Sequence, residues 1–223
     1  VILCASTLES VRILMNSHSP AHPHGVGASS GTLGRFVMDH CASNIYFTLP
    51  GVRDSSPSHP LTGAHSFMVP RFATAGGSTR RGGFGFWGGV QRVGVPRLFR
   101  RDADAAFGFL CARSEVEPSG DNRVEIAPDL TDAWGVPALR IECQWSEKDE
   151  ALASWARAEA ERTVEAAGGQ TGALTAHFRL GLARGLLDGM QDEWNRSIPG
   201  VFAHEVGGAR MSASPEDGVV DPY

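Results

Sequence analysis

The sequence predicts an α+β protein in which an antiparallel sheet carries helices on one face. Between Gly82 and Trp145, apolar residues recur at every second position in several runs, which indicates strands with one buried face. Short turn sequences separate these runs, so we expect neighbouring strands to pair antiparallel. A stretch with helical spacing follows Ser146, and Asp149 stands three residues later, as in a capping box.

The strands are expected in a few well-marked places. Aromatic residues alternate with glycines around 84–87, and a second run at 107–117 turns back into a strand at 123–126. The clearest alternation lies at 139–145. Its alternate residues are expected to face the core, namely Leu139, Ile141, Cys143 and Trp145.

Helices are expected before and after this sheet. Residues 1–5 look like a short buried strand that leads into a helix ending near residue 17, capped by Ser6 or Thr7. A second helix begins after Ser146 and ends at the glycine pair 168–169. A third is expected at 174–194, where three glycines spaced four apart would give it one smooth face.

Composition excludes several classes of partner. The chain has 223 residues and a formal net charge of -5, so it has no basic surplus to hold nucleic acid. No apolar run approaches the roughly 20 residues that span a bilayer. The absence of a signal-like start favours a cytoplasmic protein.

No metal site is expected. The four cysteines are scattered without a C-x-x-C pair, and Cys4 and Cys143 are interpreted as small core residues. His18, His22 and His24 share one loop, but their spacing fits no usual ligand pattern. The first residue is Val1 and the last residues form a turn, so we expect a fragment of a longer protein.

The most informative segment is 199–211, which reads Pro-Gly-Val-Phe-Ala-His-Glu-Val-Gly-Gly-Ala-Arg-Met. It resembles a motif of the glucose–methanol–choline (GMC) oxidoreductases, most closely their pyranose-oxidase-like branch. The stretches 4–12, 29–40 and 129–137 are also similar to segments of that family. Where the family usually has glycine after the methionine, this chain has Ser212.

The resemblance implies an FAD-dependent oxidoreductase that acts on the CH–OH group of a sugar or other alcohol. His204 would be the catalytic base, and the cofactor would contact Ala5, Ser6, Gly207 and Gly208. Histidine suits the role because its ordinary pKa is about 6.5. No G-x-G-x-x-G that opens a βαβ unit, the fingerprint of FAD binding, is found in this sequence, so the fragment is expected to be inactive alone.

The resemblance also implies a domain division. Residues 1–40 would be a remnant of an α/β FAD-binding domain with its connection, and 41–197 the substrate-binding domain. Residues 198–223 would lead back to the FAD domain and carry His204. Two alternatives remain. One is a non-catalytic carbohydrate-binding module whose aromatic strand near Trp87 is the binding face, although such aromatics more often belong to a core. The other is a gene remnant without function.

Overall fold

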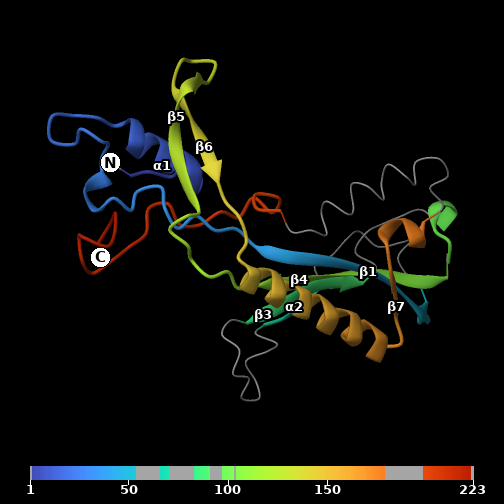
Figure 1. Ribbon diagram of the computed structural model, residues 1–223. Helices are drawn as coiled ribbons and strands as arrows, with labels where there is room; N and C mark the ends of the chain where they lie inside the picture. Colours follow the sequence, from blue (N-terminus) through green and yellow to red (C-terminus); the bar gives the residue numbers. More distant parts are fainter. Residues whose placement is uncertain are drawn as a thin grey trace. The chain divides into compact units, whose positions relative to one another are not determined.

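The structure is a computed structural model that describes residues 2–53, 66–70, 83–90, 97–102, 104–178 and 198–221 (Figure 1). The chain folds into two compact units. Unit 1 combines Val1–Asp39, Glu117–Gln144 and Phe202–Tyr223, whereas unit 2 combines His40–Val116 and Trp145–Val201. Residues 117–144 thus group with the two ends of the chain, although they were expected within 41–197. Which biological domain each unit represents stays a prediction.

Unit 2 is built on a five-stranded antiparallel sheet with the strand order β2-β3-β4-β1-β7. The α+β class with an antiparallel sheet is therefore confirmed. Two short 3-10 helices, η4 (Arg97–Phe99) and η5 (Leu174–His177), belong to the same unit. The strands are β1 (Cys41–Arg53), β2 (Ser66–Val69), β3 (Phe84–Val90), β4 (Ala105–Ser114) and β7 (Gln170–Gly172).

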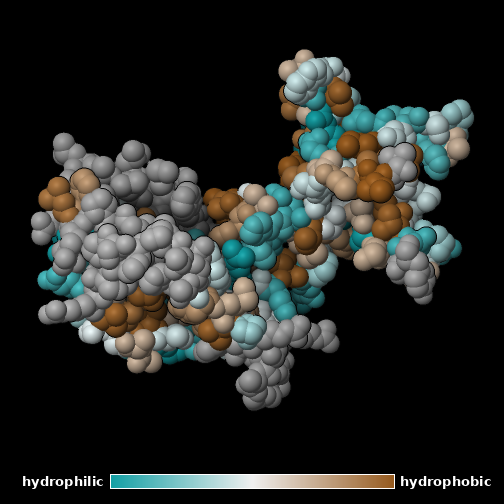
Figure 2. All heavy atoms as spheres, turned by 180° about the vertical axis from the view of Figure 1, so that it is seen from behind, coloured by the Kyte–Doolittle hydropathy of each residue, from teal (hydrophilic) through white to brown (hydrophobic). Residues whose placement is uncertain are grey.

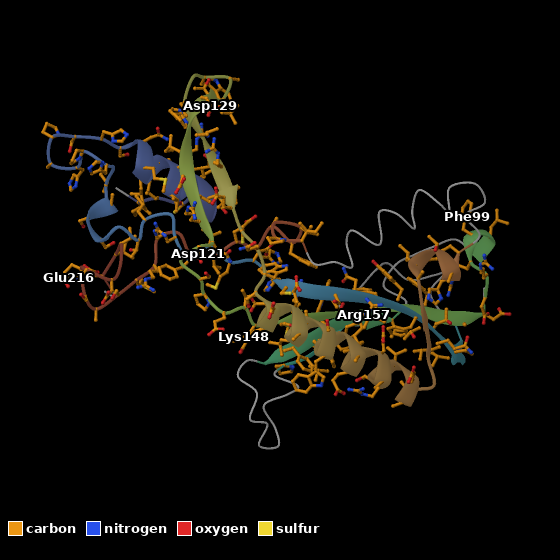
Figure 3. All side chains as sticks on the ribbon, viewed as in Figure 1. Phe99, Asp121, Asp129, Lys148, Arg157 and Glu216 are labelled. Carbon is orange, nitrogen blue, oxygen red and sulfur yellow. The ribbon has the colours of Figure 1, made fainter. Side chains whose placement is uncertain are left out.

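Helix α2 (Glu147–Ala166) covers one face of this sheet (Figure 1). The predicted capping box is present, because the Ser146 side chain accepts from the Asp149 amide and the Asp149 carboxylate accepts from the Ser146 amide. Its outer surface carries charged residues, including Lys148 and Arg157, which Figure 3 labels. The inner face and the sheet share one apolar core, formed by Ile45, Phe47, Phe84, Phe86, Leu110, Ala112, Ala156, Ala160 and Val164.

The opposite face of the sheet is lined with aromatic rings. Tyr46 stacks with Phe107 at 6.3 Å between ring centroids, and Trp87 meets Phe109 edge to face at 5.1 Å. Phe107 also contacts the ring of His177. Burial raises the pKa of Tyr46 and lowers the pKa of His177. Trp87 lies on this face, whereas Phe84 and Phe86 belong to the core under α2. This agrees with the prediction that alternating aromatic residues on a strand are core residues.

Unit 1 joins helix α1 (Ser6–Asn16) and the 3-10 helix η1 (Ala28–Ser30) to a two-stranded hairpin, β5 (Arg123–Thr131) with β6 (Pro137–Glu142). Val11, Leu33, Val37 and Val124 form its buried core. Arg12 holds the hairpin turn to α1: its Nε donates to the Pro137 carbonyl at 2.7 Å and its Nη2 to Asp132 at 2.7 Å. This ion pair lowers the pKa of Asp132.

The amino-terminal expectations are wrong in two respects. No strand forms at residues 2–5 of the described chain, and Ile2 is 88% exposed. An apolar run becomes a strand only when another strand pairs with it, and composition cannot supply that partner. Helix α1 begins after Ala5 without a side-chain cap; Thr7 lies inside its first turn, and its hydroxyl donates to the distant Glu205 carbonyl. Cys4 is exposed and is not a core residue.

Two further expectations fail. Ile141 is 53% exposed, so the run 139–145 does not bury one continuous face; β6 belongs to a hairpin of two strands with little surface to cover. The expected helix at 174–194 does not begin as an α-helix, since the 3-10 helix η5 ends at His177 and the next residue, Phe178, has an extended backbone that bridges to Arg100. The glycines at 181, 185 and 189 lie outside the described residues.

Hydrophobic residues also reach the surface, as the brown areas of Figure 2 show. On the hairpin of unit 1 these include Leu130, Trp134 and Val136, with Trp134 87% exposed. No helix among the described residues is long and apolar enough to cross a membrane.

We predict that Ser146→Ala lowers the free energy of unfolding by about 1 kcal/mol, because it removes the side-chain acceptor of the capping box. Ser154→Ala, at an exposed position inside the same helix, is the control and should be neutral or slightly stabilising. Urea unfolding followed by circular dichroism measures both. Equal effects of the two substitutions would contradict the capping role.

Candidate active site

The segment with His204 is an integral part of unit 1. It runs beside residues 34–38 in antiparallel fashion: Met38 and Val206 exchange both backbone hydrogen bonds at 2.9 Å. Further along, the Gly208 amide donates to the Arg35 carbonyl at 3.0 Å, and the Gly34 amide donates to the Gly208 carbonyl at 2.6 Å. We call residues 202–208 the return segment.

The glycine pair of the motif is required by packing within the chain. Gly207 has φ +91°, and a Cβ there would stand 1.9 Å from the Phe36 carbonyl oxygen. Gly208 has φ +71°, and its Cβ would stand 2.7 Å from a methyl group of Val11. Both positions therefore exclude a side chain whatever ligand is bound. A direct role of these glycines in flavin contact stays a prediction.

His204 is exposed, so it is not a packed core histidine. Its backbone amide donates to Oδ1 of Asp39 at 3.3 Å, and Asp39 is only 6% exposed. The residue before it, Ala203, has φ +51°, a left-handed conformation that is uncommon for a residue with a side chain. The backbone around His204 is thus held in a specific and strained shape.

The start of α1 lies against the return segment. The Thr7 hydroxyl donates to the Glu205 carbonyl at 2.7 Å, which joins residues separated by 198 positions. Ala5 and Ser6 precede this contact directly, and Ser6 has φ +63°. The structure therefore brings the predicted residues of the amino-terminal stretch into the same unit as His204, Gly207 and Gly208.

Of the remaining motif residues, Arg210 packs within unit 1 and Met211 is exposed. The Arg210 guanidinium lies 4.2 Å from the centroid of the Phe36 ring, and its Nε donates to the Asp217 carbonyl at 2.7 Å. Phe36 itself has φ +61°. Met211 is 69% exposed and packs little within the described chain.

Sequence reasoning missed the role of Asp39. Asp39 lies in the stretch 29–40 that is similar to the family, but nothing in the sequence indicates a partner for its carboxylate. One sequence feature could have drawn attention to it, because an acidic residue two positions after the core residue Val37 needs hydrogen-bond donors if it is also buried.

Other candidate sites are weaker. Among the described residues, no group of three or more His, Cys, Asp or Glu side chains could hold a metal ion. A cavity of about 420 Å³ in unit 1 is lined by His18, His24, Arg35 and Arg123 among others, but by none of the predicted site residues. Two glutamates already pair with Arg123, at 2.8 and 2.6 Å.

Comparison with known proteins supports the motif. Residues 118–223 match a family model described as GMC oxidoreductase. The chain is 27% identical over 243 aligned positions to a 2-methyl-1,2-propanediol dehydrogenase of Mycolicibacterium austroafricanum, which covers 100% of the chain and 40% of that protein. It is 23% identical over 236 positions to a fructose dehydrogenase large subunit of Gluconobacter japonicus, covering 100% of the chain and 39% of the relative.

Residues 118–223 are therefore similar to GMC oxidoreductases, and the mixed fold with its antiparallel sheet is consistent with that match. The match confirms the resemblance to this family that the motifs indicate. The chain spans about two fifths of the length of the curated relatives it matches.

We predict that Gly207→Ala destabilises unit 1 by more than about 2 kcal/mol, since a strained left-handed position alone costs about 1–3 kcal/mol and the Cβ also meets the Phe36 carbonyl. Gly31→Ala is the matched control, because Gly31 has φ +68° with nothing within 4 Å. It should cost only about 1–2 kcal/mol. Denaturant unfolding gives both values, and a Gly207 loss no larger than that of Gly31 would contradict the close approach.

Proposed function

We propose that this chain forms the substrate-binding region of a flavin-dependent oxidoreductase that acts on the CH–OH group of an alcohol or sugar, with His204 as the base. The observation that supports this most is the position of His204. Its side chain is exposed, while its backbone is tied to Asp39 and flanked by the strained Ala203. An accessible imidazole on an anchored backbone fits a role in proton transfer better than a role in core packing.

The chemistry divides between protein and cofactor. Oxidation of an alcohol removes a proton from the hydroxyl oxygen and a hydride from the carbon that bears it. A bound flavin supplies the hydride acceptor, which no amino-acid side chain provides. The task left to the chain is to orient the alcohol and to accept its proton at an imidazole nitrogen of His204. A base of this kind typically contributes about 10²–10⁴-fold to the rate.

The residues of unit 1 fit such a cofactor. Ala5 and Ser6 stand at the start of α1, where backbone amides point out of the helix and favour a negatively charged group. The bond from Thr7 to Glu205 keeps this helix start beside the return segment. Gly207 and Gly208 leave that segment without side chains next to His204. We propose FAD as the ligand, in agreement with the family.

The donor is proposed to be a polyol or sugar. One relative is named for a diol and the other for fructose, and both compounds carry several hydroxyl groups.

We predict that His204→Ala lowers kcat by about 10²–10⁴-fold in the oxidoreductase that contains this chain, with KM changed by no more than about threefold. His22→Ala, at another exposed histidine, is the control and should keep full activity. Steady-state kinetics with fructose and with 1,2-propanediols measures the effect. Full activity of His204→Ala would remove the base assignment, and binding of sugar without turnover by the wild type would favour a binding module.

We also predict that the 223-residue chain alone does not retain FAD. The reason is that the pyrophosphate-binding fingerprint is a G-x-G-x-x-G at a turn from strand to helix, whereas this spacing at 83–88 runs into strand β3 of an antiparallel sheet. The chain would be mixed with excess FAD, desalted, and examined for flavin absorption against free FAD treated in the same way. Retention of one flavin per chain would contradict the prediction.

A further inference from the structure

We propose that Asp39 is a positioning residue that sets the place of His204; this inference rests on the proposed role of His204 as the base. Asp39 lies shortly before strand β1 and is buried in unit 1. Its carboxylate oxygen Oδ1 accepts the hydrogen bond of the His204 backbone amide at 3.3 Å. The contact joins two residues 165 positions apart.

The geometry follows from the pairing of the two segments. Met38 and Val206 form a hydrogen-bonded pair, in which each amide donates to the other residue's carbonyl at 2.9 Å. In an antiparallel ladder the next amide that points toward the partner segment is two residues further, which is the amide of His204. Here a side chain, that of Asp39, accepts from this amide. The hydrogen bond therefore continues the ladder just where the chain bends.

The bend explains why such a bond is needed. Ala203 adopts a left-handed backbone at φ +51°, which a residue with a Cβ holds only when its surroundings impose it. The Asp39 carboxylate fixes the amide immediately after this residue. Because the imidazole of His204 is exposed, its position depends strongly on how the backbone beneath it is anchored.

Burial makes donors to this carboxylate necessary. A carboxylate that is 6% exposed is costly to bury unless donors point at it, and the His204 amide is one such donor. The same charge acts on a neighbour: burial and the carboxylate of Asp39 together raise the pKa of Cys143, whose thiol donates to the Val37 carbonyl at 3.8 Å. Asp39 is thus a charged group within the packed base of the return segment.

The first test measures amide hydrogen exchange by NMR on the 223-residue chain. Asp39→Leu removes the acceptor at similar volume, and we expect the protection of the His204 amide to fall about tenfold or more while that of Val206 persists. Asp39→Asn keeps an oxygen acceptor and should retain protection within about threefold. Asp149→Leu, at a buried aspartate of unit 2 that is 4% exposed, is the matched control and should leave the His204 amide unchanged.

The second test measures kcat and KM in the oxidoreductase that contains this chain. Asp39→Leu should lower kcat about tenfold or more with KM within about twofold, and Asp39→Asn should restore most of kcat. Unchanged kcat in Asp39→Leu, or equal loss of protection at His204 and Val206, would overturn the positioning role. A wild-type His204 amide that exchanges without protection would overturn it even if the leucine variant does not fold.

The two proposals fail separately. If His204→Ala keeps its activity, the proposed base is wrong, while the exchange of the His204 amide still decides whether Asp39 anchors that backbone. If His204→Ala is inactive and Asp39→Leu is fully active, the base stands and the positioning role is overturned.

Discussion

The structure of unit 1 depends on the antiparallel pairing between residues 34–38 and the return segment. This pairing closes a loop of well over a hundred residues, whose ordering costs entropy that local contacts do not offset. Close packing supplies the compensation, because Gly207 lies against the Phe36 carbonyl and Gly208 against Val11. A side chain at Gly207 would push the two segments apart, and one at Gly208 would push against helix α1. The motif glycines are therefore first of all a condition for closing the fold.

The elements predicted correctly are those that depend on residues close together in the sequence. The capping box of α2 is formed within four residues, and the alternation at 84–86 needs only one buried sheet face, so both could be predicted. Strand β1 was not predicted, and Pro50 and Gly51, which usually indicate a turn, lie inside it. Both residues fall between Leu49 and Arg53, where the register with β4 shifts. An irregularity in the pairing accommodates a proline that has no amide to donate.

The candidate site also has one part that was predicted from the sequence and one that was not. His204 was found through its resemblance to a family motif, since no periodicity marks a histidine as a base. Asp39 was not found, because its partner is 165 residues away and no spacing rule connects them. The contact from Thr7 to Glu205 was missed for the same reason. Long-range hydrogen bonds of this kind are visible only in the folded chain.

Backbone strain gives an argument for the site that is independent of sequence comparison. Three residues with side chains adopt left-handed backbones among the described residues, and all belong to unit 1: Ser6, Phe36 and Ala203. Each stands beside a contact of the return segment, at the start of α1, at Gly207 and at His204. Strained conformations persist only where neighbouring contacts impose them, and such places are often functional. The strain gathers around the histidine that the motif singles out, so sequence and geometry point to the same few residues.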